Sequence, residues 1–306
     1  MAALEGVYLG LDLGGTLLKA AVYDPSTATQ EILGSYPIGD GMELFEASGR
    51  IVQSLAKQNK ATIGIGLGLP GVLDHRNKLR FSPHRGELVG VDIKAGIAGV
   101  SGVWPLIDND ANCATALEAH HYPNSSVMVV NFGTGVGAGL AISGSVFKGA
   151  NASFGEIGHV GHFGSEVCAC KRVGCFEVEL YSLLDPVSKS KGPDFEAAAE
   201  LVADVLFDYI RVLDPECLVL GGGLIYSSNG FFEMVSKGLE STNSAYRSGF
   251  VLRIHKATGL EYSGAIGAAL LSSGAVGVIV DKWPDPGNPG DSRLDIYSDK
   301  LTQMWH

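Results

Sequence analysis

The chain has 306 residues, of which 46% are hydrophobic, and it carries a formal net charge of −11. A chain of this length exceeds the size at which a single hydrophobic core stops growing, so we expect two domains. The acidic balance, without clusters of Lys and Arg, argues against nucleic acid or an anionic membrane surface as a partner. A small anion such as a nucleotide is still compatible, because backbone N–H groups and Mg²⁺ can hold it.

The N-terminal sequence MAALEGVYLGLDLGGT has no basic segment, and Asp12 and several glycines interrupt its apolar run. Long uninterrupted apolar stretches are absent as well, so we expect no signal peptide, no membrane helix and a cytoplasmic location. The five cysteines are an odd number, and three of them are close together between Cys168 and Cys175. In a cytosolic protein this spacing favours metal ligation over a disulfide framework.

The first third of the chain alternates between predicted strands and helices. VYLGL and LLKAAVYD predict a β-hairpin around the turn DLGGT. The spacing of apolar residues then predicts further elements in this order: a helix over 42–59, a strand over 61–72, a helix over 92–100, a strand over 103–110 and a helix over 111–121.

The pattern restarts at residues 126–149, where a strand, a turn containing Gly-Thr and a second strand repeat the first hairpin. We interpret the repeat as two related α/β halves, each opening with a hairpin that faces a phosphate. The remaining predicted elements are a helix over 197–214, a strand over 217–224, a helix over 230–240, the strand FVLRIHKA and a small-residue helix over 263–276. The Pro-, Gly- and Asp-rich sequence from Gly277 onward predicts a tail.

Three glycine-rich turns are candidates for binding a nucleotide. Glycines let backbone N–H groups approach a phosphate without a Cβ in the way, and Asp12 at the end of the first strand could hold Mg²⁺. An ordinary tight turn would explain each turn alone, but two hairpin turns about 120 residues apart favour a clamp on the phosphates. LGGGL, the third turn, suits adenine or ribose, although taken alone it is better explained as a plain strand-to-helix turn. The expected nucleotide-binding residues are Asp12, Gly14, Gly15, Thr16, Lys19, Gly133, Thr134, Gly135, Gly221, Gly222 and Gly223.

The sequence DND, residues 108–110, follows a predicted strand and precedes a predicted helix. A carboxylate held at such a junction is well placed to act as a general base, so Asp110 is the candidate catalytic residue. Asn109 could hydrogen-bond a substrate hydroxyl. Helix capping by Asn109 or Asp110 is the alternative role, and it does not exclude catalysis.

Seven segments occur in the order in which ROK-family proteins have them: DLGGT, GIGLGLPGVLD, DNDANCATALEA, NFGTGVGAGL, GEIGH, CACKRVGCFE and VLGGGL. The chain therefore resembles this family of bacterial-type sugar kinases and sugar-responsive repressors over residues 6–272. The resemblance implies the actin-like ATPase (ribonuclease H-like) fold, with two α/β domains and a cleft between them. The expected parts are a small domain over 1–110 closed by the helix near 263–276, a larger domain over 111–262 with a zinc knuckle, and the tail over 277–306.

By this resemblance, the ligands of a structural zinc ion would be His159, Cys168, Cys170 and Cys175. Three thiolates and one imidazole would make a closed tetrahedral site, which is typical of structural zinc. His162 is a rival for His159, and a redox role for the CAC sequence is a weaker alternative. The knuckle departs from the family pattern at Lys171, where family members often have glycine.

The resemblance also implies a sugar site. Glu156, His159 and Glu177 would bind sugar hydroxyls, with Glu179 as a rival for Glu177, and Asn109 and Asp110 would contact the hydroxyl that is phosphorylated. The segment FSPHRGE (81–87) replaces the Pro-Asn-Leu of many members, so His84 and Arg85 bear on which sugar is bound.

We therefore expect an ATP-dependent hexose kinase that acts at the C6 hydroxyl, with Asp110 as general base, Mg²⁺ bound with the help of Asp12, and a homodimeric assembly as is common in the family. The alternative is a sugar-binding regulator without catalysis. The family's repressors carry an N-terminal helix-turn-helix, for which the residues before Asp12 leave no room. Polyphosphate is less expected as the phosphate donor. A long anionic donor would need a row of Lys and Arg side chains, and the sequence shows none.

Overall fold

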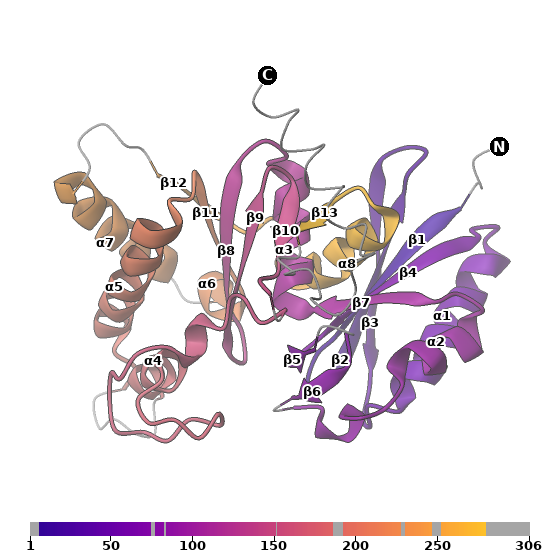
Figure 1. The fold of residues 1–306 in the computed structure, drawn as a ribbon, viewed down its shortest axis with the longest axis horizontal. Helices are drawn as coiled ribbons and strands as arrows, with labels where there is room; N and C mark the ends of the chain where they lie inside the picture. The colour runs from indigo at the N-terminus through magenta and orange to yellow at the C-terminus, as the bar shows by residue number, and fades with distance from the viewer. Residues whose placement is uncertain are drawn as a thin grey trace, which may run out of the picture.

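The computed structural model describes residues 6–74, 77–82, 84–150, 152–185, 192–227, 230–246 and 252–279. These residues form two large β-sheets, each covered by helices, with two further helices between them (Figure 1). Among the described helices, none combines the length and the apolar character needed to span a bilayer.

The first sheet has the strand order β3-β2-β1-β4-β7. The first three strands in the chain form an antiparallel meander, and β4 and β7 continue the sheet parallel to β1. Leu and Ile side chains of the sheet form one core with the helices α1 (Glu43–Lys57) and α2 (Ile93–Ser101). The strands are β1 (Val7–Leu13), β2 (Leu17–Asp24), β3 (Thr29–Pro37), β4 (Thr62–Leu69) and β7 (Pro105–Asn109).

The second sheet has the strand order β12-β11-β8-β9-β10-β13. It repeats the opening hairpin of the first sheet, since β8 pairs antiparallel with β9 around the turn 133–135. A second core lies between this sheet and the helices α4 (Phe176–Leu184), α5 (Phe195–Leu213) and α7 (Phe231–Tyr246). The strands are β8 (Ser126–Phe132), β9 (Val136–Ile142), β10 (Ser145–Phe147), β11 (Cys217–Gly221), β12 (Arg253–Lys256) and β13 (Gly277–Ile279).

The helices α3 (Asp110–His121) and α8 (Ser263–Ser273) lie between the two sheets (Figure 1). They pack at very short range because glycines line the contacts. A Cβ at Gly10 of β1 would lie 1.8 Å from the carbonyl oxygen of Ala265, and one at Gly267 would lie 1.6 Å from that of Cys113. Backbone therefore contacts backbone here, which explains part of the high glycine content.

Every helix and strand predicted above is present, with boundaries shifted by a few residues. The sequence did not predict β3, α4, the short helix α6 (Gly223–Ser227) or the two-stranded ribbon of β5 (Val72–Leu73) and β6 (Leu79–Phe81). It also predicted one strand where β9 and β10 form an antiparallel pair. Two expectations are corrected. The strand predicted over 217–224 ends at Gly221, because α6 begins two residues later. The first three residues of the predicted tail form β13, which pairs with β10, and residues 280–306 lie outside the described part.

Candidate active site

The first glycine turn joins β1 to β2. Gly14 N donates to the carbonyl oxygen of Leu17 at 2.8 Å, and Ile38 N donates to that of Thr16 at 2.9 Å. Gly15 and Thr16 are exposed, and their N–H groups donate no hydrogen bond within the described part of the chain. The turn therefore presents two unpaired N–H groups, which is the arrangement that binds phosphate oxygens.

Asp12 lies at the base of this turn, opposite Lys19 in the strand pairing. Its carboxylate fills a space that small residues leave open. A Cβ at Gly264 would lie 2.6 Å from the carboxylate of Asp12, and one at Gly68 would lie 3.3 Å from it. Burial raises the pKa of Asp12 to about 6, and the positive charge of Lys19 acts in the opposite direction.

Asn109 and Asp110 lie where β7 ends and α3 begins. Asn109 Oδ1 accepts hydrogen bonds from Ala111 N at 2.8 Å and Asn112 N at 3.3 Å, and its Nδ2 donates to Gly71 O at 3.0 Å. Asn109 is therefore the helix cap, the alternative role foreseen for it. Oδ1 of Asp110 accepts from Ala111 N at 2.9 Å. Within the described contacts, Oδ2 of Asp110 and one amide N–H of Asn109 are left for a ligand.

The carboxylate of Asp110 is half-buried and lies near other negative charges. Burial raises the pKa of Asp110 to about 7, and the charges of Asp12 and Glu156 contribute to the rise. Burial and the charge of Glu177 also raise the pKa of Glu156. A carboxylate whose pKa lies near neutrality can accept a proton at physiological pH. The convergent carboxylates also form a set of oxygen ligands that suits Mg²⁺.

The second and third glycine turns lie against each other. β8 and β11 are parallel neighbours, with Gly221 paired to Asn131, so their carboxyl ends meet. Gly222 has a φ of +90°, and a Cβ on it would lie 2.3 Å from the carbonyl oxygen of Phe132. Only glycine tolerates both this conformation and this approach. The two turns therefore form one continuous backbone surface.

The helix α4 supports the second glycine turn with two side chains, four residues apart on one face. Oε2 of Glu177 accepts from Val136 N at 2.7 Å. The hydroxyl of Tyr181 donates to the carbonyl oxygen of Gly133 at 2.7 Å and lies 3.3 Å from that of Gly135. Sequence reasoning missed Tyr181 because it did not predict α4, whose helical spacing would have paired it with Glu177.

The GEIGH loop lies along β9. Ala138 N donates to Gly155 O at 3.0 Å, and a Cβ at Gly158 would lie 2.5 Å from Val136 O. This contact carries Glu156 and His159 to the side of the sheet where the second glycine turn lies. The expected sugar ligands Glu156, His159 and Glu177 are thus brought close to one another.

Four candidate zinc ligands converge next to this loop. One ligand atom from each of His159, Cys168, Cys170 and Cys175 lies within 4.8 Å of all the others. Nδ1 of His159 is 3.4 Å from the Cys168 sulfur, and the sulfurs of Cys170 and Cys175 are 3.5 Å apart. These donors fit a tetrahedral zinc ion. Lys171, where the family often has glycine, has a φ of +69°, so the knuckle turn holds a side chain in a left-handed conformation.

His159 faces two groups at once. Its Nδ1 faces the thiols, and its Nε2 lies 4.0 Å from a carboxylate oxygen of Glu156. The rivals lie elsewhere: His162 is exposed and outside the four-ligand cluster, and the carboxylate of Glu179 lies against Gly164 of the knuckle. The geometry therefore favours His159 and Glu177 over their rivals.

A sequence profile of the ROK family matches residues 8–181 and 190–275. The chain belongs to the ROK family. The N-acetyl-D-glucosamine kinase of Vibrio cholerae is 28% identical to this ROK protein over 257 residues, covering 71% of the chain and 84% of the kinase.

Solved structures show that the fold is also shared. The ROK hexokinase from Thermus thermophilus matches with a TM-score of 0.72 at 24% identity, covering 88% of this chain and 98% of the hexokinase. A ROK family transcriptional regulator, a homolog of the E. coli MLC protein, matches with a TM-score of 0.68 at 18% identity, covering 88% and 78%. The predicted actin-like ATPase fold is confirmed.

Two buried charges of this ROK protein were not predicted as parts of the site. Lys148, which follows β10, forms an ion pair with Asp108 of β7, and both side chains are buried. Asp108 also accepts hydrogen bonds from Asn109 N at 2.8 Å and Asn112 Nδ2 at 2.9 Å. The ion pair therefore links the two sheets, and Asp108 is two residues before Asp110 in the sequence. Nothing in the sequence around Lys148 signals this partner, because it lies 40 residues earlier in the chain.

Proposed function

We propose that this ROK protein is an ATP-dependent sugar kinase that phosphorylates a hydroxyl of a hexose or hexose derivative. The observation that carries the proposal is the position of Asp110 at the junction of β7 and α3, beside the fixed amide of Asn109 and with one carboxylate oxygen left for a ligand. The sequence similarity to N-acetyl-D-glucosamine kinases supports the same class of reaction.

In the proposed reaction Asp110 accepts the proton of the sugar hydroxyl while that oxygen bonds to the γ-phosphorus and the bond from phosphorus to the bridging oxygen of ADP breaks. The transition state of phosphoryl transfer is loose, so the protein contributes chiefly by positioning the reactants. The Asn109 amide, fixed by its capping bonds, lies next to the base and orients the hydroxyl.

The phosphates of ATP would be held by backbone N–H groups of Gly15, Thr16 and the turn 133–135. Asp12 would hold Mg²⁺, directly or through water, and the bound ion would neutralise charge on the phosphates. The place of Asp12 at the base of the first glycine turn, next to the proposed phosphate-binding N–H groups, supports this assignment. The turn 221–223 would carry the adenosine.

For the sugar, we propose Glu156, His159 and Glu177 as hydroxyl ligands and C6 as the position of the reacting hydroxyl. Carboxylates and an imidazole can accept and donate the several hydrogen bonds that a sugar needs. The four knuckle ligands would hold a structural zinc ion, because their set is closed and leaves no position for a substrate. The domain boundaries after 110 and 262 and the homodimer also remain proposals.

A sugar-binding regulator is the second candidate, and the regulator fold described above means that fold alone does not decide between the two. A regulator without catalysis has no need for a proton acceptor of raised pKa. Asp110 therefore favours the kinase.

The deciding experiment measures Mg²⁺- and ATP-dependent ADP release with a panel of hexoses, N-acetylhexosamines and amino sugars. For Asp110→Asn we expect kcat to fall by about 10²–10⁴-fold while sugar binding by calorimetry persists. Asp92→Asn is the matched control, because it makes the same exchange at the start of another helix, where Asp92 is the N-cap, accepts from Ala95 N and is exposed. Sugar binding without turnover on any member of the panel would favour the regulator, and normal turnover in Asp110→Asn would remove Asp110 as the base.

The pH dependence offers a second test of the same residue. The base must be deprotonated to act, so kcat/KM should rise with pH and level off above a pKa of about 7. A profile that is flat between pH 5 and about 8 would contradict the assignment of the raised pKa to the base.

A further inference from the structure

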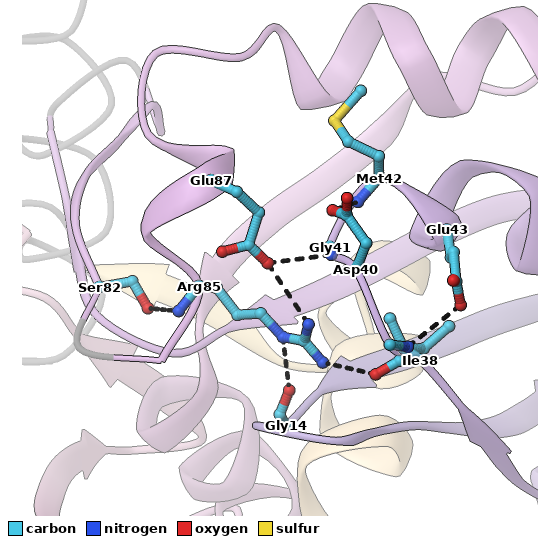
Figure 2. Close-up of polar contacts among 10 residues, drawn as sticks. Gly14, Ile38, Asp40, Gly41, Met42, Glu43, Ser82, Arg85 and Glu87 are labelled. Atoms are coloured by element: carbon cyan, nitrogen blue, oxygen red, sulfur yellow. Dashed lines mark hydrogen bonds and ion pairs between the residues drawn. The ribbon is translucent and has the colours of Figure 1, made fainter.

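The segment 82–88 places an arginine in the interior of the first half, directly behind the first glycine turn. The Arg85 side chain is 2% exposed, and its backbone N–H donates to Ser82 Oγ at 3.1 Å. A buried guanidinium is costly unless its N–H groups are paired, so its partners indicate why it is there. Figure 2 shows these partners converging on Arg85 from three separate segments.

Each nitrogen of the guanidinium has a partner. Nε donates to the carbonyl oxygen of Gly14 at 3.0 Å, and one terminal nitrogen donates to that of Ile38 at 3.2 Å. The other terminal nitrogen lies 3.4 Å from Oε1 of Glu87, and that same oxygen accepts from Gly41 N at 2.9 Å. Because Glu87 and two carbonyl oxygens occupy the guanidinium, its charge is not directed at a ligand.

The bond to Gly14 has a consequence for the neighbouring residue. The carbonyl group of Gly14 and the N–H group of Gly15 belong to one planar peptide unit, and in a trans peptide they point in opposite directions. Glycine does not restrict this unit by itself, because it is permissive in both dihedral angles. A donor that holds the Gly14 oxygen therefore fixes the direction of the Gly15 N–H group.

A second bond holds the far end of the turn, where the Thr16 carbonyl group shares a peptide unit with the N–H group of Leu17. Ile38 N holds the carbonyl oxygen of Thr16, and Arg85 holds the carbonyl oxygen of Ile38. Arg85 thus contacts the turn once directly and once through the segment that flanks it. The bond to Gly14 therefore points the Gly15 N–H group away from Arg85, and the bond through Ile38 holds the position of the turn.

We propose that Arg85 is a positioning residue that aims the N–H group of Gly15, in the first glycine turn, at the terminal phosphates of a nucleoside triphosphate. Arg85 acts by fixing the orientation of the peptide unit in the turn, and its positive charge does not contact the phosphates. This inference rests on the proposed function, since it assumes that the turn binds a nucleotide, and it assigns a role to the segment 81–87 in which this chain departs from the usual ROK pattern.

The test measures the dissociation constant of the Mg²⁺ complex of a non-hydrolysable ATP analogue by calorimetry, alongside that of the sugar found in the panel. Arg85→Met removes all three donors, and Arg85→Lys keeps the positive charge but replaces the planar fork with a single ammonium group. We expect both variants to bind the nucleotide about tenfold more weakly, which corresponds to losing the aim of one backbone hydrogen bond to phosphate. Sugar binding should change by less than about twofold.

Arg80→Met is the matched control, because Arg80 lies in β6, two residues before the segment 82–88, but its side chain is 64% exposed and pairs with Asp74. It should leave the nucleotide affinity unchanged. Hydrogen exchange of residues 13–17 adds a readout that needs no ligand: exchange there should be faster in both Arg85 variants than in Arg80→Met.

Three outcomes would overturn the proposal. Unchanged nucleotide affinity in a folded Arg85→Lys protein would show that charge alone suffices, and an equal loss of sugar and nucleotide binding would show a general structural role. If the wild-type protein binds sugar but no nucleotide, the proposed kinase function is wrong. The proposed role of Arg85 is then wrong as well, because it depends on nucleotide binding. The measurement on the wild-type protein therefore tests the kinase function, and the measurements on the variants test the role of Arg85.

Discussion

The two hairpin turns of this protein have the same local design but different supports. Both join antiparallel strands, both contain Gly and Thr, and in both a side chain from outside the hairpin donates to carbonyl oxygens of the turn. At the first turn the donor is Arg85, which holds Gly14. At the second turn it is Tyr181, whose hydroxyl holds Gly133.

The difference shows what each turn depends on. Arg85 comes from the segment 82–88 of the first half. Tyr181 and Glu177 come from α4, which begins directly after the last knuckle cysteine, Cys175. Only the second turn is therefore coupled to the candidate zinc site, and perturbations of the two turns should be separable.

Removing the metal should separate the two turns most clearly. Structural zinc contributes on the order of 10 kcal/mol in small zinc domains, so we expect a chelator to disorder the knuckle and release α4. Hydrogen exchange should then accelerate at residues 133–136 and stay unchanged at residues 13–17. Metal analysis of the untreated protein should find one zinc ion per chain. Equal acceleration in both turns would contradict the separation.

The ion pair between Asp108 and Lys148 joins the halves that carry the two turns. Lys148→Met leaves a buried carboxylate without its partner, and we expect the free energy of unfolding to fall by about 3–5 kcal/mol. Urea denaturation measures this loss.

The double variant Asp108→Asn/Lys148→Met is its control, because it removes both charges. It should recover most of the loss. A double variant whose cost equals the sum of the two single costs would mean that the pair is not coupled.

Tyr181→Phe tests the support of the second turn alone. Loss of the hydroxyl leaves the Gly133 carbonyl oxygen without this donor, at a cost of about 1 kcal/mol. Nucleotide binding should weaken by about three- to tenfold, and the exchange of residues 13–17 should not change. Tyr209→Phe, at a half-buried position of α5, is the control. Combined with Arg85→Lys, the losses should add, since the two supports share no contacts.

The smallest effect is expected inside the knuckle, at Lys171. A residue with a Cβ is strained by about 1 kcal/mol at its φ of +69°, and glycine is not strained there. Lys171→Gly should therefore raise the free energy of unfolding by about that amount, measured in the zinc-loaded protein. Lys171→Ala keeps the Cβ and should give no gain. A gain in both variants would point to the lysine charge instead of the backbone.

Much of the fold is predictable from the sequence because its signals are local. The repeated pattern of strand, Gly-Thr turn and strand predicts both hairpins, and the apolar spacing predicts the main helices. The strand β3 escapes prediction because it lies at the sheet edge with several exposed residues and lacks a clear alternation of apolar side chains. The strand β13 escapes it because three residues carry little pattern before they pair with β10.

The site divides in the same way. The turns, the DND junction and the knuckle spacing could be identified because their residues are close together in the sequence. Arg85, Lys148 and Tyr181 could not be assigned from sequence alone. Each acts on a partner between 40 and 71 residues away, and the sequence does not show that Arg85 and Lys148 are buried. The only signal was the departure from the family pattern at 81–87, which pointed to a difference without giving its cause.

The position of α8 also bears on how the protein is made. This helix packs on β1 and β4 through the glycines of those strands, yet it is the last helix of the described chain. The first sheet is complete in the nascent chain at Asn109, but one of its faces stays uncovered until Ser273 has left the ribosome. At ordinary rates of synthesis this delay is on the order of ten seconds. The N-terminal half is thus translated first and completed last, and its apolar face is exposed to aggregation during that interval.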